Sequence, residues 1–213
     1  MKTIIFTILY ISLASVVAYI SVMYLGMAEM GKAIVFIIIG FVLVGASAFT
    51  AAYSRLWGEK GGQWATIVLR NLLGIPLWIT GFVLAWLEPP LFLLSPDIAL
   101  KLIGSLLIIL GSIPVIWGHI ALGWRTHMPS VKDTIVQNGL YSHVRHPIYS
   151  GGFVILAGLA LIRPASAFVL ACVLGFIWLI VQARLEEIDL LQRMPDYKDY
   201  MKRVPRFFPR LWR

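Results

Sequence analysis

Charged residues and cysteine are both scarce in this sequence. Lysine, arginine, aspartate and glutamate make up 13% of the 213 residues, whereas hydrophobic residues make up 60%. This composition lies outside the range of ordinary soluble domains and predicts a membrane protein. The one cysteine, Cys172, lies within an apolar run, so the chain can form no internal disulfide.

Zinc-type clusters of cysteine and histidine are also missing, so we predict no metal site. The formal net charge of +8 could suit a nucleic-acid partner. However, the basic residues gather in the loops between apolar runs, which is typical of the cytoplasmic loops of membrane proteins. We therefore expect the bilayer, and no nucleic acid, as the partner of this basic charge.

Six apolar runs approach the length of about 20 residues that a helix needs to cross a bilayer. They cover residues 3–25, 33–53, 67–87, 99–120, 148–162 and 165–183. The first run could instead be a cleaved signal peptide, but it continues beyond the small residues near position 18 and is long enough to span. We predict an all-α, multi-pass transmembrane helical bundle of about five to six membrane segments.

Only Arg163 and Pro164 separate the last two runs. So short a connection predicts an antiparallel helical hairpin, because Pro164 breaks the helix. At 1.5 Å per residue the first arm is roughly 22 Å long, shorter than the ~30 Å hydrocarbon core. This arm is therefore expected to be partly re-entrant or to thin the bilayer locally.

Glycines in these runs recur every seven residues, at Gly104, Gly111 and Gly118, with Gly151 and Gly158 in the hairpin. This spacing puts the small residues on one helix face and predicts a close helix–helix contact.

Lysine and arginine predict the orientation of the bundle. With the N-terminus in the cytoplasm, all but three of the 18 basic residues fall on the cytoplasmic side; the exceptions are Lys32, Lys101 and Arg163. We predict both termini to be cytoplasmic, in the plasma or inner membrane of a prokaryote or the endoplasmic reticulum of a eukaryote.

The densest polar run, residues 139–151, opens the hairpin. Pro147 suits the first turn of a helix, and it biases His146 away from helical backbone angles. Arg145 and His146 therefore precede a helix N-terminus, where N–H groups, the helix dipole and a guanidinium favour a carboxylate. Tyr149 adds a hydroxyl group. Alternatively, the basic residues only anchor the helix to lipid phosphates.

Glu186 and Glu187 follow the second arm of the hairpin. Acidic side chains are unusual at the cytoplasmic end of a span. Arg184 could pair with Glu187 at i,i+3, but this would leave Glu186 unexplained. Because the hairpin is antiparallel, we expect the two glutamates to lie beside residues 145–149. The two clusters would then form one pocket, with a cationic and an anionic end that suit a zwitterionic ligand.

The C-terminal tail contains a predicted short amphipathic helix at residues 196–203, with Tyr197 and Tyr200 at i,i+3. Anchoring in the membrane interface is one interpretation of this segment, and a lid over the pocket is the other.

Several of these motifs occur together in one known family. The run from Arg145 to Gly151 resembles the Arg-His-Pro-x-Tyr-x-Gly motif of the isoprenylcysteine carboxyl methyltransferase family. Other matching stretches are Gly139-Leu140-Tyr141, Glu186-Glu187 followed by Leu190, Tyr197-x-x-Tyr200, and Val204-Pro205-Arg206. The resemblance covers roughly residues 120–210 and is specific when the motifs are taken together.

The resemblance implies an integral-membrane methyltransferase that binds S-adenosylmethionine on its cytosolic side. It implies a cofactor site lined by Gly139, Leu140, Tyr141, Arg145, His146, Pro147, Tyr149, Glu186 and Glu187. Arg145 and His146 are the expected catalytic residues. Tyr197, Tyr200 and Arg206 are the expected substrate-binding residues. Residues 1–120 would form an N-terminal unit of four spans, and residues 121–213 the catalytic loop, hairpin and tail.

The expected methyl acceptor is lipophilic or membrane-associated, most like the carboxylate of an isoprenylcysteine. A phospholipid amine or a small thiol is the alternative, and either must first lose a proton, with His146 or a glutamate as base. Two other classes stay open. One is an NADPH-dependent membrane reductase, and the other is a non-catalytic membrane assembly protein whose polar clusters are ion pairs and lipid anchors.

Overall fold

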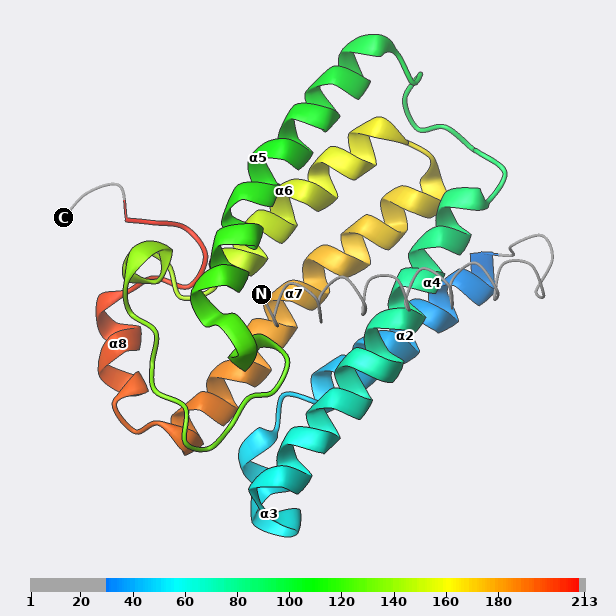
Figure 1. The fold of residues 1–213 in the computed structure, drawn as a ribbon. Coiled ribbons are helices and arrows are strands. Elements are labelled where there is room, and N and C mark those ends of the chain that lie inside the picture. Colours follow the sequence, from blue (N-terminus) through cyan, green and yellow to red (C-terminus); the bar gives the residue numbers. More distant parts are fainter. Residues whose placement is uncertain (1–29, 211–213) are drawn as a thin grey trace.

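The computed structural model describes residues 30–210, and its regular elements are helices (Figure 1). They are α2 (Met30–Ala46), α3 (Thr50–Thr66), the π-helix η1 (Ile67–Gly74), α4 (Ile75–Leu87), α5 (Ile98–Leu122), the 3-10 helices η2 (Gly123–Thr126) and η3 (Gly139–Ser142), α6 (Pro147–Ile162), α7 (Ser166–Arg193) and α8 (Tyr197–Arg203). The predicted all-α class is confirmed for this range. The first predicted span, residues 3–25, lies outside the described residues.

Three helical stretches in residues 30–210 are long and apolar enough to cross a membrane. They are Thr50–Leu87, Ile98–Thr126 and Ser166–Arg193. The helices α2 and α6 are apolar but shorter. The 16 residues of α6 measure about 24 Å at 1.5 Å per residue. The first arm of the hairpin is therefore as short as the sequence predicts.

The predicted run 33–53 is interrupted, because α2 ends at Ala46 and α3 begins at Thr50. Inside α3 the chain turns sharply at Gly58, whose φ of +73° suits a residue without a Cβ atom. From there the helix continues through η1 into α4, which returns along α2. A Cβ atom on Gly81 would lie 2.7 Å from the carbonyl oxygen of Ala33, so these two helices pack backbone to backbone.

The predicted glycine contact joins α5 to α6. A Cβ atom added to Gly104 would lie 2.6 Å from the carbonyl oxygen of Gly158, and one added to Gly111 would lie 2.7 Å from that of Gly151. Only glycine allows such an approach, which confirms the helix–helix contact inferred from the seven-residue spacing. The helix α5 lies almost wholly in the first predicted unit and α6 in the second, and the two helices pack along each other. The division of the chain at residue 120 stays a prediction.

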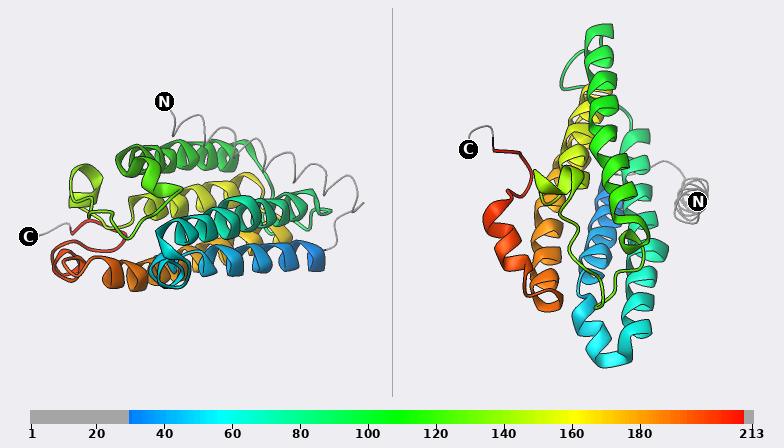
Figure 2. Two further views of the ribbon diagram at one scale, coloured as in Figure 1. Left: turned by 60° about the horizontal axis from the view of Figure 1, so that its bottom comes forward. Right: turned by 60° about the vertical axis from the view of Figure 1, so that its left-hand side comes forward.

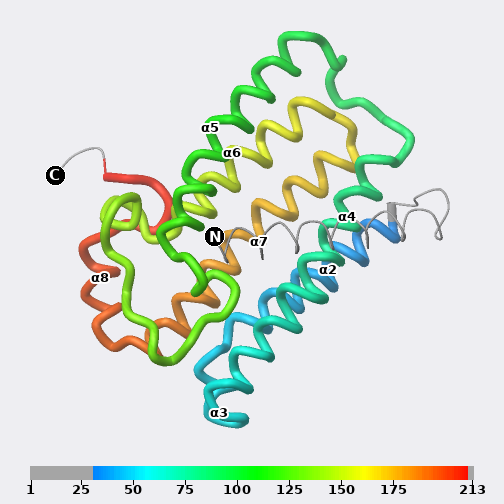
Figure 3. Tube along the Cα trace, in the orientation of Figure 1, coloured from blue at the N-terminus to red at the C-terminus, as the bar shows by residue number. Residues whose placement is uncertain are grey.

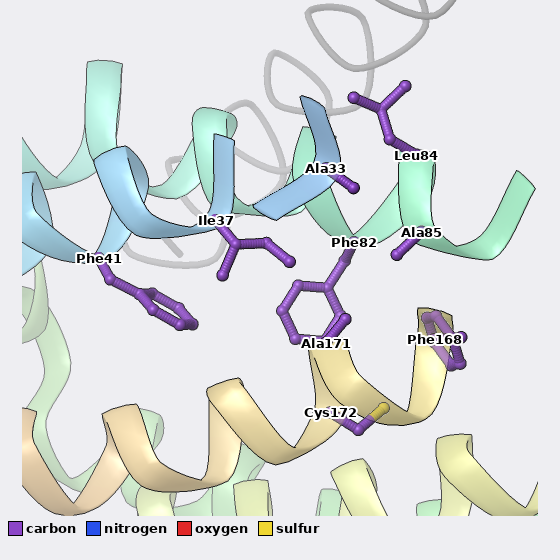
Figure 4. Packing of buried hydrophobic residues seen from close by; sticks show 9 residues of the cluster. All are labelled: Ala33, Ile37, Phe41, Phe82, Leu84, Ala85, Phe168, Ala171 and Cys172. Atoms are coloured by element: carbon purple, nitrogen blue, oxygen red, sulfur yellow. The ribbon is translucent and has the colours of Figure 1, made fainter. Parts of the chain in front are cut away.

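The apolar core lies between α2, α4 and α7 (Figure 4). Its buried members are Ala33, Ile37, Phe41, Phe82, Leu84, Ala85, Phe168, Ala171 and Cys172. The rings of Phe82 and Phe168 meet edge to face, with their centroids 6.2 Å apart. The core lies toward the end of the bundle where α4 ends and α7 begins.

The opposite end of the bundle, here called the polar end, is where α2, α5 and α7 end and α6 begins. The loop from η2 to η3 and the tail with α8 lie against it (Figures 2 and 3). Arg193 Nη1 donates to the carbonyl oxygen of Ser130 at 2.7 Å, and Lys132 Nζ lies 2.5 Å from Glu59 Oε2, so the loop is tied to both α7 and α3.

The grouping of basic residues follows the predicted topology. Arg145 and Lys132 belong to the polar end. Arg163 lies at the other end, where its Nη2 donates to the carbonyl oxygen of Glu88 at 3.0 Å. The side of the membrane that the polar end faces stays a prediction.

Candidate functional site

The two polar clusters predicted from the sequence meet at the polar end. Glu187, near the end of α7, is 1% exposed. Its carboxylate lies 2.9 Å from Arg145 Nη2, 3.2 Å from His146 Nε2 and 2.6 Å from Arg206 Nη2. Arg145 and His146 directly precede α6, so the antiparallel hairpin brings the clusters together as predicted. Arg184 is exposed, and the alternative pairing with Glu187 therefore does not account for this buried carboxylate.

Arg145 is committed to contacts within the protein. Its Nε and Nη2 donate to Glu187 Oε1, and its Nη1 donates to the carbonyl oxygens of Met201 at 3.0 Å and Val204 at 2.5 Å. Its backbone N–H also donates to Pro205 at 2.9 Å. Arg145 therefore holds the tail against α7. Its role in cofactor binding and catalysis stays a prediction.

Glu186 has a different environment from Glu187. Its Oε1 accepts from the hydroxyl of Tyr149 and, at 3.1 Å, from Gln182 Nε2. The ring of His146 stacks on that of Tyr149 with centroids 5.4 Å apart, and His146 Nδ1 lies 3.9 Å from Glu186 Oε2. The side chain of Glu186 is 26% exposed, so its carboxylate can accept further hydrogen bonds.

Beside Glu186 lies a buried hydrogen-bond acceptor that receives no hydrogen bond within residues 30–210. Gln182 Oε1 is buried and has no hydrogen-bond partner within residues 30–210. A buried polar atom of this kind costs free energy unless a donor reaches it. A ligand with N–H or O–H donors, such as an ammonium group or a diol, would satisfy both Gln182 and Glu186.

The stretch 139–142 forms the short helix η3 beside α5. It starts at Gly139, where φ is +60°, and Leu140 supplies a carbonyl that closes the next turn. Tyr141 is buried, which raises the pKa of its hydroxyl. That hydroxyl donates to the carbonyl oxygen of Gly118 at 3.4 Å, and Tyr200 donates to the carbonyl oxygen of Tyr141 at 2.5 Å. These residues, like Pro147 at the start of α6, hold the backbone around the site.

The tyrosine side chains of the tail are buried in a small hydrophobic cluster. Tyr197 and Tyr200 are buried together with Met194 and Val204, and burial raises the pKa of Tyr200 to about 12. Arg206, which follows α8 in the chain, donates through Nη2 to Glu187 Oε2 at 2.6 Å. The contacts of these side chains are within the protein, and the predicted role of Tyr197, Tyr200 and Arg206 in substrate binding stays a prediction.

Two residues near the site were not found by sequence reasoning. Gln182 is one, and it precedes Glu186 by one helical turn. Asp189 is the other: it is 2% exposed, lies 2.6 Å from Arg193 Nε and accepts from the backbone N–H of Ala51 at 2.7 Å. The i,i+4 spacing of Asp189 and Arg193 was the available signal. Within residues 30–210, no group of three or more His, Cys, Asp or Glu side chains could hold a metal ion.

The segment that carries both clusters is similar to a known protein family. Residues 100–194 match the phospholipid methyltransferase family model. This family is part of the isoprenylcysteine and phospholipid methyltransferase superfamily. The matched segment runs from α5 to the end of α7, so it includes both polar clusters and stops before the tail.

Two curated proteins are similar to part of the chain. The nickel-cobalt-cadmium resistance protein NccN of Alcaligenes xylosoxydans xylosoxydans is 36% identical over 78 residues, which are 36% of this chain and 37% of that protein. The cobalt-zinc-cadmium resistance protein CzcN of Cupriavidus metallidurans is 32% identical over 80 residues, 37% of each chain. The chain thus covers 37% of the length of either relative. No solved structure matches it.

Proposed function

We propose that this protein is an integral-membrane methyltransferase that transfers a methyl group from S-adenosylmethionine to a lipophilic or membrane-associated acceptor. One observation carries the proposal. The accessible carboxylate of Glu186, flanked by Tyr149 and the unpartnered Gln182 Oε1, lies within the segment that matches phospholipid methyltransferases.

The residues present fit this cofactor. S-adenosylmethionine carries an ammonium group and a ribose diol, which could donate to Gln182 Oε1 and add to the hydrogen bonds that Glu186 already accepts from Tyr149 and Gln182. Its carboxylate would lie at the entrance of α6, where Pro147 begins the helix and the first N–H groups have no partner within the helix. When bound, the cofactor supplies a methyl group made electrophilic by a positively charged sulfur.

The contribution of the protein would be mainly positioning and exclusion of water. His146 is fixed between the ring of Tyr149 and that of Phe207, with centroids 5.4 Å and 6.0 Å away. A carboxylate acceptor needs no base. An amine or thiol acceptor must first lose a proton, and Glu186 is the favoured base because Glu187 is already paired with three cationic or basic side chains.

The identity of the acceptor rests on two resemblances. The motifs of residues 139–206 resemble those of isoprenylcysteine carboxyl methyltransferases, whereas the matching family model is that of phospholipid methyltransferases. Both kinds of acceptor are carried by lipids. We therefore propose a lipid-borne acceptor that enters between helices, with the cofactor entering from the cytosol.

Titration calorimetry in detergent tests the proposal, with S-adenosylmethionine and NADPH as separate ligands. We expect the former to bind and the latter not to bind. Glu186→Ala should abolish binding of S-adenosylmethionine, whereas Glu59→Ala, at the same end of the bundle, should not change it. Binding of NADPH alone would support a reductase. Binding of neither ligand would support a non-catalytic assembly protein.

A screen of acceptors then identifies the substrate. Purified protein would be incubated with methyl-labelled S-adenosylmethionine and, in separate reactions, with a prenylated cysteine, a phosphatidylethanolamine and a small thiol. We expect label in one of the two lipid-borne acceptors. Label in the thiol alone would contradict the lipid-borne assignment while leaving the methyltransferase assignment in place.

A further inference from the structure

Within residues 30–210, Arg70 at the polar end has no carboxylate partner. Its Nε donates to Asn71 Oδ1 at 3.3 Å, and its Nη2 donates to the carbonyl oxygen of Thr126. These bonds use two of the five N–H groups of a guanidinium. Among residues 30–210, no ion pair involves Arg70.

The π-helix η1 separates polar from apolar side chains at this point. Asn71 is 2% exposed and faces the interior, where its amide donates to the carbonyl oxygen of His127 at 3.5 Å. On the outer side, Val68, Leu72 and Leu73 are exposed by 39%, 46% and 44%. Short π-helical turns are frequent at functional sites. Here the turn presents polar side chains inward and an apolar surface outward. We call the inward group, formed by Arg70, Thr126 and His127, the arginine corner.

The groups that line this corner are mainly donors. Thr126 Oγ1 is buried and has no hydrogen-bond partner in the described part of the chain. The neighbouring His127 is also buried. Burial, and then the charges of Arg70 and His119, lower its pKa to about 4, so it adds no charge at neutral pH. An anion would satisfy both the guanidinium and the free hydroxyl group.

The corner lies at the same end of the bundle as the proposed methyl-donor site. Arg70 donates to Thr126 in η2, which directly follows α5. The helix α5 packs along α6, whose first turn carries Tyr149 and its hydrogen bond to Glu186. A molecule held at Arg70 could extend toward Tyr149 and the site where the methyl group would be presented.

We propose that Arg70 and Thr126 bind the anionic group of the methyl acceptor, a phosphate or carboxylate carried by a membrane amphiphile. The inference rests on the proposed function, which it deepens by naming the acceptor chemistry. The apolar outer surface of η1 would receive the hydrocarbon chain. The anion at Arg70 would fix the depth of the acceptor and orient its reacting group toward Tyr149.

A purely structural clasp is the alternative explanation of Arg70. Such a clasp would tie η1 to the end of η2 and needs only the bond to the carbonyl oxygen of Thr126. It leaves the buried hydroxyl of Thr126 without a partner within residues 30–210, and an unmade bond of this kind costs free energy. An anion removes that cost, and the clasp alone does not.

The experiment uses the whole chain in micelles of a non-ionic detergent, which carries neither phosphate nor carboxylate. The probes are phosphatidic acid, a long-chain fatty acid and inorganic phosphate, and binding is measured by native mass spectrometry. Arg70→Gln and Thr126→Val should each lower the affinity for an anionic lipid on the order of tenfold. Calorimetry with S-adenosylmethionine should give the same affinity as the wild type for both variants.

Arg55→Gln is the matched control, because Arg55 lies at the same end and, among residues 30–210, its Nη2 donates to the exposed Gln192 Oε1 at 3.0 Å. An equal loss of lipid affinity in this control would overturn the proposal, since it would show general attraction to the basic end. Unchanged affinity in both Arg70→Gln and Thr126→Val would overturn it too. Thr126→Val keeps the carbonyl clasp, so it decides the matter if Arg70→Gln does not fold.

The two anion sources and the two proposals are separable. If inorganic phosphate competes with the lipid, the site recognises the charged group alone. If the lipid binds and inorganic phosphate does not compete, recognition also requires the hydrocarbon chain. Both results support the anion site. Lipid binding that depends on Arg70 without any binding of S-adenosylmethionine would refute the methyltransferase and leave the anion site standing.

Discussion

Arg206 Nη2 lies 2.6 Å from Glu187 Oε2, and this contact ties the tail of the chain to the end of α7. The other oxygen of the same carboxylate accepts from Arg145, just before α6. One buried glutamate thus joins three segments that are separated in the sequence. Because Glu187 is 1% exposed, its charge depends on these partners for compensation.

Replacing Glu187 should destabilise the fold. Glu187→Ala leaves Arg145 and Arg206 without their carboxylate partner, and loss of one partner from a buried ion pair costs about 3–5 kcal/mol. Chemical unfolding in detergent micelles measures this. Glu59→Ala is the control, because its ion pair with the exposed Lys132 lies at the surface, where solvent screens it and such pairs contribute little to stability. A similarly small loss of unfolding free energy in both variants would contradict the stabilising role of Glu187.

Gln182 offers a test of the donor site that does not remove a charge. Gln182→Met keeps the size of the side chain and deletes both the buried oxygen that has no partner within residues 30–210 and the Nε2 group that donates to Glu186. If the cofactor satisfies this oxygen, calorimetry should show the affinity for S-adenosylmethionine falling about tenfold. The melting temperature without cofactor should not fall by a comparable amount. Unchanged affinity would place the cofactor elsewhere.

The meeting of the two clusters could be predicted because it depends on local sequence. Arg163 and Pro164 leave room only for a tight reversal, so the start of α6 and the end of α7 must lie together. The glycine contact between α5 and α6 followed from a seven-residue spacing in the same way. Short-range geometry and periodicity were sufficient for both features.

The partners within the site could not be predicted, because they come from distant segments. The sequence placed Arg145 beside a ligand, but the tail returns and supplies the carbonyl of Val204 and the guanidinium of Arg206. Arg70 lies 56 positions from Thr126, and an apolar run gives no signal for a π-helical turn. Such contacts depend on tertiary packing, which composition and periodicity do not encode.

The contact between α5 and α6 should tolerate no added side chain. In Gly111→Ala the new Cβ atom would lie 2.7 Å from the carbonyl oxygen of Gly151, so the helices must move apart. Overpacking of this kind costs about 1–3 kcal/mol. Gly31→Ala is the control, since nothing in the described part of the chain lies within 4 Å of its added Cβ atom. Equal unfolding free energies for the two variants would contradict the contact.

Acid should weaken the fold through His127. Burial and the charges of Arg70 and His119 lower its pKa from 6.5 to about 4 in the folded protein. Between these values the unfolded state binds more protons than the folded state, so stability falls as the pH drops through this window. The whole shift corresponds to about 3 kcal/mol at most.

Melting temperatures measured across this pH window would test the effect. His127→Asn should show a flatter dependence of stability on pH than the wild type, because asparagine does not titrate. His143→Asn, which replaces an exposed histidine, should keep the slope of the wild type. If the slope survives in His127→Asn, the acid sensitivity arises from other groups, and the corner formed by Arg70 and His127 is not desolvated as described.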